Sequence, residues 1–307
     1  MHAAVLTAFL FALTGVCATQ ASRLLGAARA NLWRLLLALL ILGIWAHGFG
    51  EGFGGGVVTW FALAGGIGFG LGGWCMLQAL RRIGSTLSLL VVECAAAVLA
   101  AAIAWIWLGA ALGRWEILFA LLILFGVVLG STSAPIPSLP RRAIWIGCGL
   151  ALLAALFQAI SFNLSRHAFL LVRDLGETLS PLTAAYQRLC GGAVVALLLY
   201  GITRLVMQWR QFPHNTPRNT PFPVENTRLP APVWVFGNAL FGPVLGVTCM
   251  LWAIRMVPNP GLVQAIAATA TLITIPLARR LEGARPRTRY FLGCACALLG
   301  ATGLFLM

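Results

Sequence analysis

The sequence predicts an all-α membrane protein with ten transmembrane helices, arranged as two inverted repeats of five helices each. Of its 307 residues, 60% are hydrophobic and only 9% are charged, whereas a soluble domain carries charge on about a quarter of its residues. Long apolar runs recur along the whole chain, and a helix needs about 20 apolar residues to cross a bilayer. A membrane barrel would instead show alternating segments of about 10 residues, so we expect helices.

The runs with the length and composition of a membrane span can be read in order along the chain. They are expected at 3–22, 31–47, 57–80, 84–109, 114–131, 143–164, 182–206, 232–254, 259–280 and 287–306. The first run differs from a secretory signal because no basic segment precedes it and it exceeds the roughly 7–15 apolar residues of a signal core. We therefore expect it to be a span of the mature protein.

Two polar segments organise the chain. A proline-bearing linker at 132–142 separates five runs from five, so residues 1–131 and 143–307 are expected to be two five-helix units. A longer segment at 207–231 is rich in Pro, Asn and Thr. That composition is typical of an irregular loop, which we expect inside the second unit.

The two halves share a sequence frame, G-x-x-C-M-L-x-A-x-R. It begins at Gly72 in the third run and at Gly246 in the eighth. Further polar landmarks occur in the same order in both halves: Gln20 and Asn163, Arg34 and Arg188, and Glu93 and Gln264. A duplicated unit with an odd number of crossings inserts its second copy upside down, an architecture that many secondary transporters use for alternating access. The repeat therefore favours a carrier.

Several longer stretches resemble the EamA-type family of the drug/metabolite transporter superfamily. They are R-L-L-L-A from Arg34, I-G-S-T-L-S-L-L-V-V-E ending at Glu93, the segment 261–283, and L-G-C-A-C-A-L-L-G from Leu292. The resemblance covers essentially the whole chain. It implies ten spans and the export or exchange of small metabolites such as amino acids.

The chain departs from the family pattern in two places. Leu108-Gly109-Ala110 stands where the first copy usually has a glutamate after its fourth span, and Cys94 replaces the proline that often follows the span-four acid. The substrates of the family are diverse, and fold analogy does not identify one. The resemblance therefore leaves the substrate open.

Glu93 is the acidic residue that falls well inside an apolar run. An ionisable group near the bilayer centre costs roughly 3 kcal/mol on insertion scales, so it is a functional-site hypothesis by default. The alternative is that it lies near the membrane interface or pairs with an arginine such as Arg34 or Arg188. We favour a role as proton carrier because its repeat mate, Gln264, is also polar.

Other polar and aromatic residues of the runs are weaker candidates. Arg34 and Arg188 open their spans, so we favour snorkelling to the interface over attraction of an anionic substrate group. The buried amides usually hydrogen-bond a neighbouring helix, and a minority could contact substrate: Gln20, Gln78, Asn163, Gln158 and Asn238. Trp74 and Trp252 lie in the repeated frames and could wall a cavity, although tryptophan also anchors spans at interfaces.

Glycine and proline suggest close packing and bends. The segment 65–73 of the third run is rich in glycine, and small residues let helices approach closely. It is no phosphate loop, because it lacks the lysine and the strand–turn–helix setting. Pro243 and Pro276 are expected to kink their helices.

The remaining sequence features argue against other classes of protein. The eight cysteines match no zinc spacing, and no nucleotide-binding motif occurs, so we expect no metal and no cofactor. The basic residues, all arginines, lie mainly at span ends, which favours contact with the bilayer rather than with nucleic acid. Catalytic groups do not cluster within the runs, so an intramembrane enzyme is the weaker alternative, together with a translocase of lipid-like substrates. A channel lacks a charged ring or filter motif.

The arginine distribution bears on orientation. Even-numbered loops carry only Arg114, Arg166, Arg173 and Arg255. Most other arginines lie in odd-numbered loops, which the positive-inside rule places in the cytoplasm, with both termini outside. The family resemblance implies both termini inside, so orientation stays open. Arginine-only basic usage and compact loops fit a bacterial inner membrane, and the sequence leaves open whether the protein is a monomer or an oligomer.

Overall fold

The computed structural model describes residues 2–131, 140–209, 229–282 and 288–306, and no strand occurs among them. The prediction of an all-helical chain is therefore confirmed for this part. The first half contains α1 (His2–Leu25), α2 (Ala27–Gly48), α3 (Val58–Gly65), the π-helix η1 (Gly66–Gly72), α4 (Gly73–Leu108) and α5 (Arg114–Ser131). The second half contains α6 (Arg141–Asp174), α7 (Pro181–Trp209), α8 (Ala231–Ala239), the π-helix η2 (Leu240–Gly246), α9 (Val247–Met256), α10 (Pro260–Ala267), α11 (Ala270–Glu282) and α12 (Thr288–Leu306).

Helical segments of membrane-spanning length follow one another between His2 and Leu277. Among the described residues, eight are long and apolar enough to cross a bilayer. One of them, Val58–Leu108, has 51 residues, more than twice the length that one crossing needs. Its backbone departs from helical geometry at Gly84 (φ 78°, ψ 174°), between the runs expected at 57–80 and 84–109. The positive φ suits glycine, which lacks a Cβ.

The π-helices stand at matching places in the two halves. η1 ends at Gly72 and η2 ends at Gly246, which are the first glycines of the two copies of the repeated frame. η2 also contains Pro243. Proline has no backbone N–H, so one hydrogen bond of a regular α-helix cannot form there. The glycine-rich segment and the expected proline kink therefore both correspond to widened helical turns.

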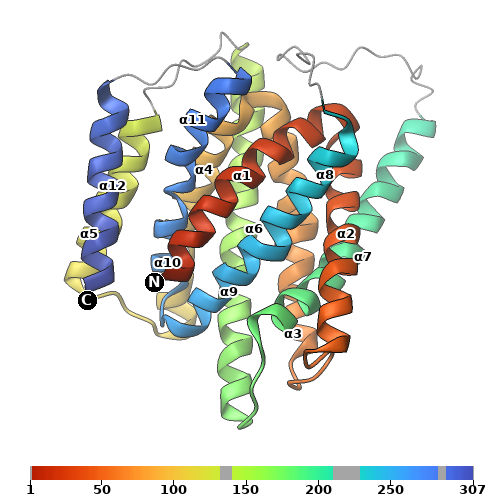
Figure 1. Ribbon diagram of the computed structural model, residues 1–307, viewed down its shortest axis with the longest axis horizontal. Helices are drawn as coiled ribbons and strands as arrows, with labels where there is room; N and C mark the ends of the chain where they lie inside the picture. The colour runs from red at the N-terminus through yellow and green to blue at the C-terminus, as the bar shows by residue number, and fades with distance from the viewer. Residues whose placement is uncertain (1, 132–139, 210–228, 283–287, 307) are drawn as a thin grey trace.

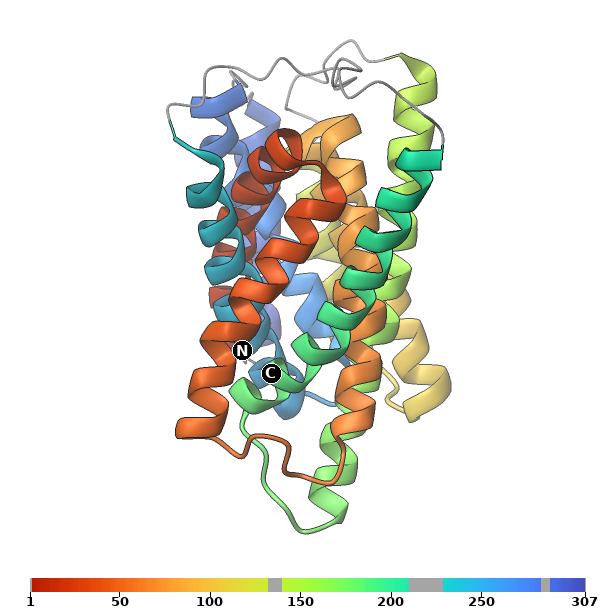
Figure 2. The ribbon, with the colours of Figure 1, turned by 90° about the vertical axis from the view of Figure 1, so that its right-hand side faces the viewer.

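The helices form a bundle whose members pack in pairs from distant parts of the chain (Figures 1 and 2). α4 packs mainly against α6, α5 against α12, and α2 against α7. α1 crosses the middle of the bundle and contacts α8, α9, α10 and α11 of the second half. In both views α1 rises from the lower end, whereas α6 descends from the upper end. The first helices of the two halves thus run in opposite directions.

α3 and α7 cross with their backbones in contact. A Cβ atom built on Gly65 would lie 1.7 Å from the carbonyl oxygen of Arg188, and one built on Gly191 would lie 1.9 Å from that of Ala62. Real Cβ contacts are almost never shorter than 3.0 Å. Only glycine permits this approach, which fixes the position of Arg188 relative to η1.

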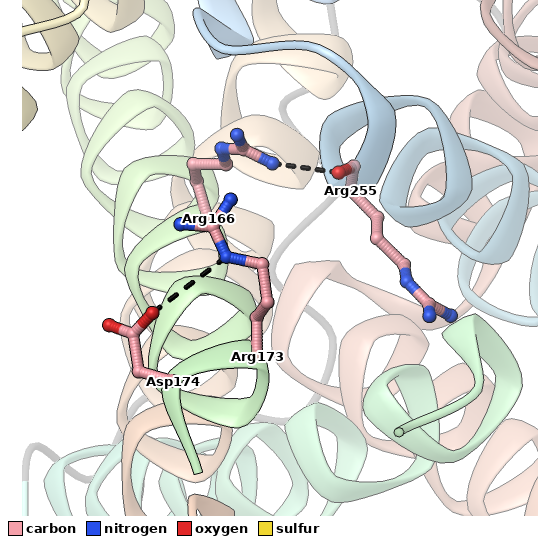
Figure 3. A network of polar contacts seen from close by, with 4 residues as sticks. All are labelled: Arg166, Arg173, Asp174 and Arg255. Atoms are coloured by element: carbon pink, nitrogen blue, oxygen red, sulfur yellow. Dashed lines mark hydrogen bonds and ion pairs between the residues drawn. The ribbon is translucent and has the colours of Figure 1, made fainter. Parts of the chain in front are cut away.

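A polar network ties α6 to the end of α9 (Figure 3). Arg166 Nη1 donates hydrogen bonds to the carbonyl oxygens of Ile254 (3.1 Å) and Arg255 (2.7 Å). These carbonyls belong to the last turn of α9, which lacks intrahelical donors. Near Arg166, the largely exposed Arg173 and Asp174 form an ion pair with an N···O distance of 3.7 Å. Arg166 thus holds the end of α9 as well as contributing charge.

Candidate functional site

A cavity of about 100 Å³ lies within the bundle. Helices from both halves line it: α1, α2, η1 and α4 from the first, and α6, α7, η2 and α9 from the second. Its polar lining comes from Thr14, Arg34, Glu93, Gln158, Ser161 and Arg188. Both π-helices of the described chain therefore border one cavity, whose largely apolar wall contains these polar groups. The volume is enough for several water molecules or a small solute.

Glu93 lies on α4, and its side chain is only 3% exposed. Gln264 of α10 donates a hydrogen bond to Glu93 Oε2 through Nε2. Gln158 of α6 donates a second bond to the same oxygen, with an N···O distance of 3.4 Å. The carboxyl group of the first half is thus held by two amides of the second half.

Arg188 lies on α7 with a side chain only 2% exposed. Its Nη2 atom donates to Ser161 Oγ at 2.7 Å, and Ser161 Oγ in turn donates to the carbonyl oxygen of Ala64 at 2.5 Å. The guanidinium carbon lies 5.2 Å from the ring centroid of Phe69 and 5.1 Å from that of Phe162. Such aromatic faces stabilise a buried cation. The favoured snorkelling interpretation is therefore wrong for Arg188, because the side chain is enclosed at the cavity.

Arg34 reaches the cavity from α2 and is half-buried. Its Nε donates to Asn31 Oδ1 at 3.0 Å. Asn31 Nδ2 donates to the carbonyl oxygens of Phe69 (3.1 Å) and Gly70 (3.4 Å) within η1. Asn31 therefore satisfies carbonyls of the π-helix while it orients Arg34.

The cavity lining is electropositive. Arg34 and Arg188 each bring a guanidinium, and Glu93 brings the single carboxyl group of the lining residues. In a site shielded from water, charge–charge interactions are stronger than at an exposed surface. The arrangement is thus suited to a molecule with a negatively charged group, and its net charge depends on the protonation of Glu93.

The other predicted site residues lie outside this cavity. Trp74 packs on a cluster that includes Cys75 and Ala151, and the Gln78 carbonyl oxygen Oε1 accepts a hydrogen bond from Arg82 at 2.7 Å. Trp252 is 54% exposed on α9.

Two amides with matching places in the repeat are buried away from the cavity. Asn163 Nδ2 donates to the carbonyl oxygens of Ala100 (3.1 Å) and Ala159 (2.9 Å), which links α6 to α4. Gln20 is buried in α1 and is not among the residues that line the cavity. Asn163 therefore has the helix-pairing environment that is usual for polar groups in spans.

Some lining residues gave no clear signal in the sequence. Ser161 is one serine in an apolar helix, and Phe69 and Phe162 are aromatic residues among many. Gln158 did stand out as an amide inside an apolar run. A further clue was the density of glycine around Phe69, because widened turns and close approach accompany such runs.

Comparisons with known proteins agree with this architecture. A family model described as the EamA-like transporter family matches residues 1–132 and 145–306. A solved structure, titled only as the crystal structure of a protein, matches with a TM-score of 0.66 and 18% sequence identity. That match covers 99% of this chain and 96% of the other. At this identity it shows a shared fold alone. No curated protein matches the chain.

Proposed function

Because this chain belongs to the EamA-like transporter family, a family of the drug/metabolite transporter superfamily, and is an integral multi-pass membrane protein, we propose that it is a secondary transporter. It would export or exchange small metabolites, amino acids among them, by alternating access. The observation that carries the proposal is the cavity lined by helices of both halves, whose largely apolar wall includes two arginines and Glu93. Such a cavity between repeats is where secondary transporters bind substrate.

We propose that ten spans form two inverted units, residues 1–131 and 143–307, joined by the linker 132–142. Three observations support this. The π-helices end at matching glycines of the repeated frame, α1 and α6 run in opposite directions, and the start of α1 and the end of α12 lie toward the same end of the bundle (Figures 1 and 2). An even number of crossings requires the last of these.

The π-helices provide a physical basis for movement between the halves. A π-helical turn is widened relative to an α-helix and is frequent at functional sites. η1 and η2 both border the cavity, and bending there would open one side of it while closing the other. Pro243 and the glycines of η1 lower the resistance to such bending.

Glu93 is the proposed coupling group. An ionised carboxylate accepts stronger hydrogen bonds than a neutral one, so ionised Glu93 holds Gln158 and Gln264 of the other half more firmly. Protonation weakens these bonds and lets the halves rearrange. Transport would thereby be linked to a proton. We place the protein in a bacterial inner membrane on the basis of its arginine-only basic usage and compact loops.

Alternating access can be tested by thiol labelling at the cavity. In a variant whose native cysteines are replaced, Met76→Cys places a thiol in the cavity lining. Reconstituted protein is treated with a membrane-impermeant thiol reagent, added either outside or inside the vesicles. We expect labelling from both sides, because the cavity opens to each in turn.

The matched control is Leu42→Cys, at a side chain 2% exposed in the core, which we expect to stay unlabelled from both sides. Labelling of Met76→Cys from only one side, in protein that remains folded, would contradict alternating access.

A further inference from the structure

We propose that Arg188 anchors a carboxylate of the transported molecule, so that the substrates are small organic carboxylates with an apolar remainder. This inference rests on the proposed transport function and specifies the substrate class of the same cavity. It starts from the hydrogen-bonding state of the guanidinium group. Arg188 carries five N–H hydrogens, and the structure accounts for one bond, from Nη2 to Ser161 Oγ.

Arg188 lines the cavity, and its remaining donors are short of acceptors among the residues that the structure describes. Nε and Nη1 are buried without a hydrogen-bond acceptor among the residues described. Buried donors are nearly always satisfied, and leaving them unpaired is costly. Whichever Nη2 hydrogen the bond to Ser161 uses, a fork of two parallel N–H groups stays open, either Nη1 with Nη2 or Nε with Nη2. Such a fork matches the two oxygens of a carboxylate.

The charge of Arg188 also lacks a counter-ion among the residues that the structure describes. No acidic side chain pairs with it within the described ranges, and its close neighbours are Ser161 and the rings of Phe69 and Phe162. A buried charge is normally paired, because desolvation strongly disfavours an isolated one. A bound monoanion would supply both the missing charge and the missing acceptors.

The rest of the cavity limits what the anion can be. Phe11, Leu77, Leu89 and Val247 form an apolar part of the lining, which suits a hydrocarbon remainder. Arg34 has its Nε committed to Asn31, and the Glu93 carboxyl group disfavours a second negative charge nearby. A monocarboxylate therefore fits better than a dianionic phosphate.

The test compares carboxylates with their neutral amides. Binding of butyrate, butyramide, 3-phenylpropionate and 3-phenylpropanamide to purified protein is measured by thermal shift and by displacement of a labelled carboxylate. We expect the carboxylates to bind and their amides to bind at least about 30-fold more weakly. Arg188→Gln should weaken carboxylate binding by at least about 30-fold, as expected for loss of one partner of a buried charge pair.

Two further variants separate recognition from folding. Arg204→Gln removes the same charge from the same helix at an exposed position, where Nε donates to Tyr200 at 2.9 Å, and should bind like wild type. Arg188→Lys keeps the charge but loses the fork, so it should bind carboxylates about tenfold more weakly. If Arg188→Gln fails to fold, Arg188→Lys and the comparison of acid with amide decide the matter.

The outcomes distinguish this inference from the proposed function. Equal binding of acids and amides, or wild-type carboxylate affinity in Arg188→Gln, overturns the carboxylate anchor. Exchange of neutral solutes by protein that binds no carboxylate overturns the anchor and leaves transport standing. Carboxylate binding that depends on Arg188, in protein that exchanges no solute, supports the anchor and overturns transport.

Discussion

Glu93→Gln is expected to reduce pH-gradient-driven accumulation to the level of vesicles without protein, while solute exchange at equal pH persists. Glutamine has nearly the same shape, and its carbonyl oxygen can still accept hydrogen bonds from Gln158 and Gln264. It cannot bind or release a proton in the neutral range. The variant thus keeps the hydrogen bonds from Gln158 and Gln264 of the second half and removes the proposed proton site.

The measurement is tracer uptake into proteoliposomes with and without an imposed pH gradient. Glu116→Gln is the matched control, because its carboxylate accepts from the backbone N–H of Gly113 at 2.7 Å at the exposed start of α5. It should keep gradient-driven uptake. If Glu93→Gln also keeps full gradient-driven uptake, Glu93 is not the coupling group.

The same variant gives the sign of the pH dependence. Protonation of Glu93 removes the negative charge of the cavity lining and leaves the guanidinium groups of Arg34 and Arg188. Among the described residues that line the cavity, no other side chain carries an acidic group. Carboxylate binding should therefore tighten as Glu93 becomes protonated at lower pH in wild type, and should not change in this way with pH in Glu93→Gln.

Gly191→Ala is expected to lower the stability of the protein strongly. The added Cβ would lie 1.9 Å from the carbonyl oxygen of Ala62, and both atoms belong to helix backbone that cannot rotate aside. α3 and α7 would have to separate by about 1 Å or more. Overpacking commonly costs about 1–3 kcal/mol of stability, and a clash with backbone should cost an amount near the upper end of this range. A loss of this size lowers the melting temperature by roughly 5–10 °C.

The matched control lies on the same helix. A Cβ on Gly201 would meet nothing within 4 Å, so Gly201→Ala should be neutral or slightly stabilising because alanine favours helix by about 1 kcal/mol. Thermal unfolding of both variants in detergent gives the comparison. Equal melting temperatures would show that α3 and α7 do not cross as closely as described here.

Much of the helical architecture could be predicted from hydropathy because lipid permits few alternatives to a helix. The helical prediction is confirmed for the described residues and the family is confirmed, and the expected boundary near residues 80–84 coincides with the backbone break at Gly84. The sequence did not predict that helix would continue directly on both sides of this break, from Val58 to Leu108. A positive φ at one glycine depends on packing that hydropathy does not report.

The candidate site was harder to predict because repeat positions do not determine which way a side chain faces. Glu93 and Gln264 hold matching places and are hydrogen-bonded to each other. Trp252 stands inside the repeated frame, yet it faces outward. Arg188 looked like an interfacial arginine because it lies near the start of its run. Its side chain is enclosed by Ser161, Phe69 and Phe162, which lie far from it in the sequence.

Counterflow in proteoliposomes tests the central claim, that the protein is a carrier, most directly. Vesicles are loaded with unlabelled amino acids, other carboxylates, sugars, nucleosides or amines, and uptake of a trace of the labelled solute is followed. For at least one solute class, a carrier exchanges internal for external solute, so we predict transient accumulation of the tracer above its equilibrium level. Folded protein that shows no such overshoot for any solute of the panel would contradict the account.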